Sequence, residues 1–584
     1  MGSLVRRMDD SVARSPVGRL FRLKGCGHPK EIQDARLSAE IRAGLTTFST
    51  AAYIVAVNAS ILAESGYGCP CHKPYDLRGN CANMAEWTRC YDELKLDLIT
   101  ATTAIAGLSS ILFGLFTNLP VALGPGMGLN AYFTYQVVGI KGQGHINYRL
   151  ALTAVFLEGW IFMFLALTGM RHWLVKIIPR TIKIASGVGI GMFLTLIGMT
   201  YATGIGIITG SMTSPLALAG CPLEDLNEAG ECTSNLMSNP KMWVGVVLGG
   251  ILTTVLMSFR VRGAIIIGIA IVSIMSWPRN TPFTYFPNTP DGNWRFNYFS
   301  KVVNFHPIQH TLMQQQWDLG DEGGKFALAL FTFLYVDIID CTATLYSMAR
   351  FCSRARKDET EFPRSTVAFC VDSLCISIGA LFGMSPVTPF IESSAGIAEG
   401  GRTGLTAVVT GSCFLVALFF APILASIPPW ATGCTLILVG CMMIRQVTKI
   451  NWSYIGDAIP SFVTLAFIPF SYSVAYGLLA GLFTYTAINV GIWTVVKLSR
   501  ERVVPQNYHL KECWTWRPPR ERPWFVRAAV GVWGWVTRRK SRSTAFSLNS
   551  ADDFHHANPS EQYHPDAAPK GPADAPPEPL RQPF

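Results

Sequence analysis

Charged side chains are scarce in this sequence. Asp, Glu, Lys and Arg make up 15% of its 584 residues, against about 25% in ordinary soluble domains. Hydrophobic residues reach 50% and the mean hydropathy is +0.30. A composition so poor in charge and so rich in apolar side chains excludes an ordinary soluble protein.

Several functional signatures are also missing. No cleavable secretory signal is evident, because the first apolar window follows about forty polar, Arg-rich residues. We find no Ser/His/Asp set, metal-binding box or nucleotide-binding loop, so an enzyme is not expected. The net charge of +10 does not indicate a nucleic-acid binder, since Lys and Arg cluster in particular loops and tails, as in membrane proteins.

Long apolar windows recur along the chain instead; most have about the 17–25 residues that cross a bilayer, and several are shorter. They predict an all-α polytopic membrane protein with about fourteen transmembrane segments. The windows are 42–64, 96–118, 121–140, 149–170, 182–208, 241–259, 263–277, 325–349, 366–384, 388–400, 403–427, 429–446, 455–470 and 473–499.

The distribution of charge predicts the topology. With the N-terminus in the cytosol, alternation places the basic loops around Arg171, Arg260, Arg350 and Arg445 in the cytosol as well. The predicted parts are a cytosolic N-terminal tail (1–40), a first seven-span repeat (41–277), an extracellular loop (278–324), a second seven-span repeat (325–500) and a cytosolic C-terminal tail (501–584). We expect disorder after about residue 543, where Pro, Asp, His and Ala dominate.

The predicted extracellular loops contain an even number of cysteines. They are Cys69, Cys71, Cys81, Cys90, Cys221 and Cys232. Even numbers in an oxidising compartment favour disulfides, with one pairing for the last two and three possible connectivities for the first four. A four-cysteine zinc site is the alternative. The spacing lacks paired Cys-x-x-Cys motifs, so we favour disulfides and expect no metal or other cofactor.

Two apolar segments are interrupted by glycine and proline, over residues 118–133 and 384–396. Irregular backbone at membrane depth is tolerated only where protein buries it or where it lines a wet cavity. Each break falls in the third span of its half, which makes them the third and tenth spans of an inverted repeat. Paired breaks of this kind are typical of the binding site of a transporter.

Acidic residues inside the spans are the main candidates for chemistry. Asp337 and Asp340 share one helix face, and Glu392 lies just inside the second break. Buried carboxyl groups favour the protonated form and can bind and release a proton, so proton-coupled import is the expected mechanism. Glu158 also lies in a span, but away from both breaks, and we rank it lower.

Structural roles compete with these functional ones. Glu392 could complement the dipole of a helix that begins at Thr388 and Pro389, and Asp340 could bond to Thr342. Asn130 could cap a half-helix, or offer both a donor and an acceptor to a heterocycle. Phe390 is either a packing residue or a platform for a planar ligand.

The segment from Gly124 to Phe133, Gly-Pro-Gly-Met-Gly-Leu-Asn-Ala-Tyr-Phe, resembles the signature of AzgA-type purine permeases. Further segments agree in the same order over about residues 40–500, and they are 44–58, 156–159, 177–180 and 388–396. The long tails and the Cys-rich loop are similar to those of a fungal member. Asn58-Ala59-Ser60 and Ser49-Thr50-Ala51-Ala52 depart from the family pattern, and these departures remove no proposed ligand.

The resemblance implies the nucleobase–ascorbate transporter fold, in which a core domain moves against a gate domain. Short β-strands in the two broken spans would hold the substrate between them. It also implies that Asn130, Asp337 and Glu392 contact the purine, with Asp340 important nearby. We add the backbone near Gly128 and the ring of Phe390 as further contacts. The Gln-His of the xanthine–urate branch is not matched, which argues against oxidised purines as the main substrate.

The sequence thus predicts a plasma-membrane symporter that takes up hypoxanthine, adenine and guanine with protons, by an elevator-like movement of core against gate. Glu392, Asp337 and Asp340 are the proton-coupling candidates. A homodimer in the lipid bilayer is expected, with no nucleic acid partner. The alternatives are a transporter of another planar nucleobase, such as a pyrimidine or a cytokinin-like adenine, and a channel or sensor on the same fold.

Overall fold

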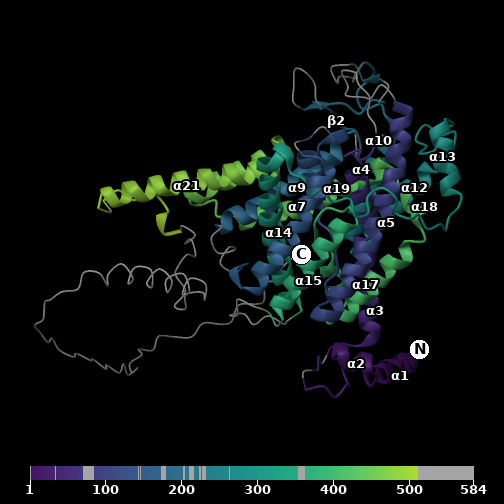
Figure 1. Ribbon diagram of the computed structural model, residues 1–584, viewed down its shortest axis with the longest axis horizontal. Helices are drawn as coiled ribbons and strands as arrows, with labels where there is room; N and C mark the ends of the chain where they lie inside the picture. The colour runs from purple at the N-terminus through teal and green to yellow at the C-terminus, as the bar shows by residue number, and fades with distance from the viewer. Residues whose placement is uncertain are drawn as a thin grey trace, which may run out of the picture. The chain divides into compact units, whose positions relative to one another are not determined.

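The computed structural model describes residues 2–510, except 30, 33, 70–83, 143, 145, 172–178, 202–203, 210–215, 223–224, 227–231, 262, 353–361, 363 and 501. The described residues belong to one compact unit and are largely helical (Figure 1). The predicted C-terminal disorder and the cysteines Cys71 and Cys81 lie outside this described part.

The first half of the chain contains α1 (Gly2–Ala13), α2 (Pro16–Phe21), α3 (Leu37–Ala51), α4 (Tyr53–Ala63), α5 (Met84–Thr117), β1 (Leu123–Pro125), α6 (Met127–Ala131), the π-helix η1 (Tyr132–Val138), the 3-10 helix η2 (Ile140–Gly142), α7 (Tyr148–Leu167), α9 (Arg180–Met199), β2 (Ile208–Thr209), β3 (Ala217–Leu218), α10 (Pro240–Val244), the π-helix η4 (Gly245–Leu252), α11 (Thr253–Ser258) and α12 (Ala264–Ser276).

The second half contains α13 (Pro290–Phe299), η5 (Gly320–Glu322), α14 (Gly323–Phe351), α15 (Ser365–Leu381), β4 (Val387–Pro389), α16 (Ser393–Ala398), α17 (Gly404–Ala417), α18 (Ala421–Ala425), α19 (Pro429–Ile444), η6 (Arg445–Lys449), α20 (Ile455–Phe470), α21 (Val474–Leu498) and η7 (Tyr508–Leu510).

The membrane-spanning character predicted from composition is confirmed. Within the described ranges, eight helical stretches are long and apolar enough to cross a bilayer, and four more apolar helices are shorter. The two broken segments complete the predicted set. Two helices begin earlier than predicted, at Leu37 and at Met84, because polar first turns pack against neighbouring segments and escape a search for apolar windows.

The spanning helices sort into two packed groups. In the first, α5 packs against α4, α15 and α17, while α7 packs against α14 and α15. In the second, α9 packs against α19, α20 and α21, and η4 packs against α12 and α19. Figure 1 shows α5 beside α17 and α9 beside α19. We call these the core group and the gate group, because their membership matches the two domains of the predicted fold.

The core group carries both broken segments, and these meet each other. Strand β1 pairs antiparallel with β4, with Leu123 opposite Pro389, Gly124 opposite Thr388 and Pro125 opposite Val387. Proline is tolerated in such a short strand pair, because it has no backbone N–H to donate to the hydrogen-bond ladder of a longer sheet. Because the pairing is antiparallel, the helices that follow, α6 and α16, begin beyond opposite ends of the strand pair.

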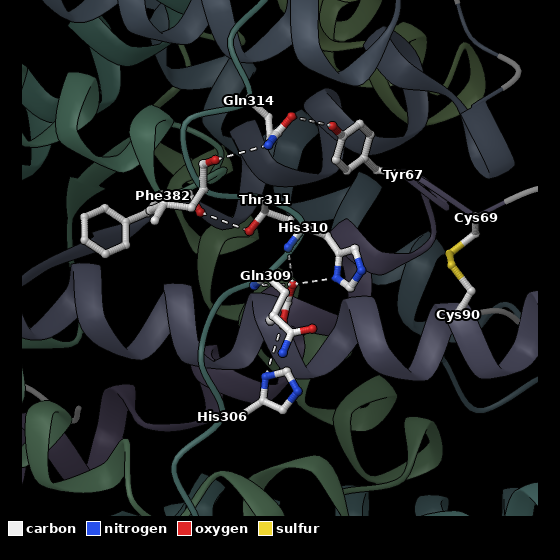
Figure 2. Close-up of polar contacts among 11 residues, drawn as sticks. Tyr67, Cys69, Cys90, His306, Gln309, His310, Thr311, Gln314 and Phe382 are labelled. Atoms are coloured by element: carbon white, nitrogen blue, oxygen red, sulfur yellow. Dashed lines mark hydrogen bonds and ion pairs between the residues drawn. A yellow bond between two sulfur atoms is a disulfide. The ribbon is translucent and has the colours of Figure 1, made fainter.

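One side of the molecule bears the disulfides, Cys69–Cys90 and Cys221–Cys232, and we call it the disulfide side. Here a strap of residues 304–316 is fastened to the buried Asp97 of α5. Asp97 Oδ2 accepts from the backbone N–H groups of Gln309 (3.0 Å) and His310 (2.8 Å). Figure 2 shows this strap and the Cys69–Cys90 disulfide. A cavity of about 490 Å³ lies beside the strap, lined by residues of α5, α13 and the strap, including Trp294 and Tyr298.

Candidate functional site

The backbone of the two breaks is satisfied across the β1–β4 pair. The Gly126 N–H donates to the carbonyl oxygen of Pro386 at 3.0 Å, and the Phe390 N–H donates to that of Ala122 at 2.9 Å. A helix interrupted at membrane depth must find such partners, because hydrocarbon offers none. The two interrupted spans therefore stabilise each other.

Serine side chains complete this backbone network. The Leu123 N–H donates to Ser110 Oγ at 3.0 Å, and the same hydroxyl donates to the Leu123 carbonyl at 3.0 Å. The Ala122 N–H donates to Ser393 Oγ at 3.0 Å. Both serines are fully buried. The strands are thus held by fixed protein groups, which is the rigid support that a binding site requires.

Phe390 directly follows β4, and its ring packs against β1. A Cβ atom added to Gly124 would lie 2.0 Å from Cζ of Phe390, so the phenyl ring rests directly on this glycine. The ring is 4% exposed and also neighbours Phe414, with 6.5 Å between ring centroids. Glycine is required at position 124 because the ring occupies the space of a side chain.

Glu392 stands at the entrance to α16, and its carboxylate does not cap the helix. Its Oε1 accepts a hydrogen bond from the hydroxyl of Tyr53 at 2.7 Å. The helix begins at Ser393, whereas Thr388 and Pro389 belong to β4 and do not start it. Glu392 remains partly exposed. Tyr53 therefore fixes the orientation of this partly exposed carboxylate.

Asn130 projects from α6 into the buried interior. Its Nδ2 donates to the carbonyl oxygen of Asn58 at 3.3 Å. Its Oδ1 is buried and has no hydrogen-bond partner among the described residues. Gly126, not Asn130, occupies the N-cap of α6. An unpartnered buried acceptor costs about 1–3 kcal/mol, and a bound donor would remove this cost.

Asp337 and Asp340 lie on α14 with different surroundings. Asp337 is 0% exposed and neither carboxyl oxygen has a partner in the described part of the chain. Asp340 is partly exposed, and its charge interacts with that of Glu392. Thr342 accepts a hydrogen bond from Arg171 Nη1 at 3.3 Å. Asp340 is therefore the more accessible of the two carboxyls, while Asp337 is fully buried.

Gly128 marks where α6 meets the gate group. A Cβ atom added to Gly128 would lie 2.5 Å from Cγ2 of Ile190 on α9. The backbone of Gly128 is therefore both near the first break and in contact with the opposing group.

Sequence reasoning missed three polar residues of this region. Tyr53, which bonds Glu392, and Asn58, which bonds Asn130, both lie in a segment already noted for its resemblance. Asp372 lies on α15 and is fully buried. An ionisable residue inside a predicted span was a usable signal for Asp372. The hydrogen-bond partners of Tyr53 and Asn58 depend on tertiary placement and had no local signal.

Comparison with known proteins places these features in context. A family model described as "Permease family" matches residues 83–480. An efflux pump of Aspergillus versicolor is 53% identical, covering 90% of this chain and 92% of its own. A Schizosaccharomyces pombe protein, which bears a provisional name as a xanthine/uracil permease, is 52% identical over 88% of this chain and 81% of its own.

A guanine/hypoxanthine permease of Bacillus subtilis is 32% identical, covering 80% of this chain and 95% of its own. Among solved structures, the transmembrane domain of a cyanobacterial bicarbonate transporter superposes with a TM-score of 0.51 at 16% identity, over 76% of this chain and 97% of that one. At this identity the structural likeness concerns the fold alone.

Proposed function

Because the chain belongs to the Permease family, whose members are membrane transporters and not enzymes, we propose that it carries purine nucleobases across a membrane. The observation that carries this proposal is the meeting of the two broken spans. Around their strand pair, Asn130, Asp337 and Glu392 offer polar atoms that the described protein leaves without partners or only half used.

The chemistry of these groups suits a purine edge. Ring N–H and exocyclic amino groups are donors, and carboxylates accept from them. The amide of Asn130 supplies an acceptor, Oδ1, that is already desolvated. A site built to bond a donor rejects analogues that lack it, because its polar atoms are then left unpaired. In this arrangement Glu392 and Asn130 recognise the base and Phe390 supports the strands.

We propose hypoxanthine, adenine and guanine as the substrates, taken up with protons. The resemblance of the two breaks and the name of the Bacillus subtilis relative support purines. The carboxyl groups near the breaks support proton coupling, because burial favours the protonated form of a carboxyl. Asp337 is buried, and Glu392 and Asp340 are partly exposed. The disulfides support a plasma-membrane location with the disulfide side facing out and both termini in the cytosol.

The movement we propose is an elevator-like shift of the core group against the gate group. Both strands and all three polar residues belong to core elements, so they would travel as one body. Gly128 has no side chain, so α6 of the core group can lie directly against Ile190 of the gate group. This contact supports a surface along which the two groups slide.

A second function is export of a planar compound. It is favoured by the name of the Aspergillus versicolor relative, an efflux pump. Two assays distinguish import from export. A proton-driven importer accumulates labelled hypoxanthine from an acidic medium, whereas an exporter speeds the loss of label from cells preloaded with it.

The test of the main proposal is uptake of radiolabelled hypoxanthine in a purine-transport-deficient yeast, across external pH and with a protonophore. Wild type should show saturable uptake that the protonophore abolishes. Glu392→Gln should lose about tenfold or more of uptake, as expected for a charge-assisted contact of about 1.5–3 kcal/mol. The matched control is Glu399→Gln, which changes a carboxylate at the far end of α16, paired with Arg42.

Unlabelled xanthine, uracil and adenine as competitors then rank the bases. Uptake of no purine by protein at the cell surface would overturn the substrate class. Purine uptake that ignores the protonophore would leave recognition standing and remove proton coupling.

A further inference from the structure

A second group of carboxyls lies in the core group and shares only Asp337 with the residues assigned to the base. Glu158 on α7, Asp337 on α14 and Asp372 on α15 are each 0% exposed. Helix α7 packs against both α14 and α15, which brings the three side chains into one interior region. Their charges interact pairwise, Glu158 with Asp372 and Asp337 with both.

Most of the oxygens in this group have no hydrogen-bond partner. Both oxygens of Glu158, both of Asp337 and Oδ1 of Asp372 are buried and unpartnered among the described residues. The exception is Oδ2 of Asp372, which accepts from the thiol of Cys341 at 2.7 Å. Structural carboxyls are normally bonded, so this pattern indicates that something outside the protein occupies these oxygens.

The next question is which ligand occupies the unpartnered carboxyl oxygens of Glu158, Asp337 and Asp372. The described residues contain no group of three His, Cys, Asp or Glu side chains placed to bind a metal ion. Ionising even one buried, unpaired carboxyl costs several kcal/mol, and neighbouring negative charges add to this cost. Protons are the ligands that satisfy buried carboxyl oxygens without a further cation.

Other titratable and charged groups border the cluster. Cys341 and Asp340 lie on α14, and Cys375 lies on α15. Arg171 donates to Thr342, and its guanidinium lies 3.3 Å from the ring centroid of Phe369. Asp340 lies three residues from Asp337 on the same helix, α14, and its charge interacts with that of Glu392, so it is the group that connects the cluster with the region of Glu392.

We propose that Glu158 and Asp372, together with Asp337, hold the transported proton, and that Asp340 passes it between this cluster and the region of Glu392. The step moves one H⁺ from one carboxyl O–H to the oxygen of the next, with no other bond changed. Recognition of the base by Glu392 and Asn130 and holding of the proton by Glu158 and Asp372 are thus tasks of neighbouring groups, with Asp337 common to both. This inference rests on the proposed function of proton-coupled purine uptake.

The test compares concentrative uptake with exchange. Glu158→Gln and Asp372→Asn mimic the protonated side chains in shape, so they should fold and still bind the base. Exchange of external labelled hypoxanthine for internal unlabelled hypoxanthine needs no net proton movement, and we expect it to stay within about twofold of wild type. Uptake driven by an acidic medium should fall about tenfold or more, and its pH dependence should flatten.

The matched control is Glu40→Gln. Glu40 is also 0% exposed, but its carboxylate accepts from the N–H groups of Arg402 and Thr403 and from the Thr406 hydroxyl. This variant should reduce the amount of folded protein while the surviving molecules keep the wild-type pH profile. The comparison separates the loss of a buried carboxyl in general from the loss of this cluster.

Wild-type pH dependence and full accumulation in both cluster variants would overturn the inference. If Glu158→Gln fails to reach the cell surface, Glu158→Asp keeps a titratable group at an altered distance from Asp372. We then expect a shifted pH profile, and an unchanged one would overturn the inference. Failure of the proposed function itself is distinguishable, because wild type would then show neither purine exchange nor purine uptake.

Discussion

At the scale of single residues, the contact between Tyr53 and Glu392 fixes the orientation of the Glu392 carboxylate. The two residues are 339 positions apart in the chain, yet the tyrosine hydroxyl donates to Oε1 of Glu392 at 2.7 Å. Tyr53 is only 2% exposed, so its ring is fixed by packing. This hydrogen bond restricts the orientation of the carboxylate, which in the proposed function contacts the base.

Replacing Tyr53 by phenylalanine should therefore weaken substrate recognition and leave the fold intact. A hydrogen bond to a charged group is worth about 1.5–3 kcal/mol, so we expect KM for hypoxanthine to rise about tenfold with little change in maximal rate. Concentration-dependent uptake at constant surface expression measures this. Tyr454→Phe is the control, since it loses a tyrosine hydroxyl bond to Asn489 outside the core group. Equal effects of the two variants would contradict the assignment.

At the scale of elements, the sequence predicted the positions of the two breaks better than the pairing of the strands within them. Prolines and glycines near 120–130 and 384–396 mark the interruption locally, and the acidic residues beside them were visible as costly groups in apolar windows. The pairing of β1 with β4 entered only through a family resemblance. Strands of three residues that lie far apart in the sequence, at 123–125 and 387–389, leave no periodic signal, and their register is set by packing.

The same reasoning explains the other differences. The helices α1, α2 and α13 lie in segments predicted only as a tail or a loop, because short polar helices are stabilised by tertiary contacts that composition does not reveal. Asp372 was overlooked, although a span with a single acidic residue carried the signal. The structural alternative for Glu392 assumed a helix start at Thr388 and Pro389. These two residues belong instead to strand β4, and the helix begins at Ser393.

The strand pair itself can be tested through Gly124. Its substitution by alanine should separate β1 from β4, because the new Cβ would lie 2.0 Å from Cζ of Phe390. Overpacking of this kind costs about 1–3 kcal/mol, and we expect uptake to fall to about a tenth or less. The double variant Gly124→Ala/Phe390→Leu should recover part of the loss.

Uptake by Phe390→Leu alone separates the two roles of this ring. Activity near wild type would agree with packing of the strands. Complete loss of activity, with no recovery in the double variant, would instead favour direct contact of the ring with the base.

At the scale of the whole molecule, the proposed elevator-like movement requires the core group to shift while its strand pair stays intact. The strands are held within the core group by backbone and serine contacts. The contact of Gly128 with Ile190, by contrast, joins a core helix to a gate helix. Binding and movement therefore depend on different residues, and a substitution at the contact between groups should separate them.

Gly128→Val places a branched side chain where a Cβ would already lie 2.5 Å from Ile190 Cγ2. Packed interfaces do not deform continuously, so we expect the core group to be wedged in one position. Both uptake and exchange of hypoxanthine should fall about tenfold or more, while hypoxanthine still raises the melting temperature of the purified protein. Ile190→Ala in the same chain removes the obstructing methyl groups and should restore exchange. A variant that loses ligand stabilisation together with transport, and that Ile190→Ala fails to rescue, would place Gly128 in the binding site and not at a sliding surface.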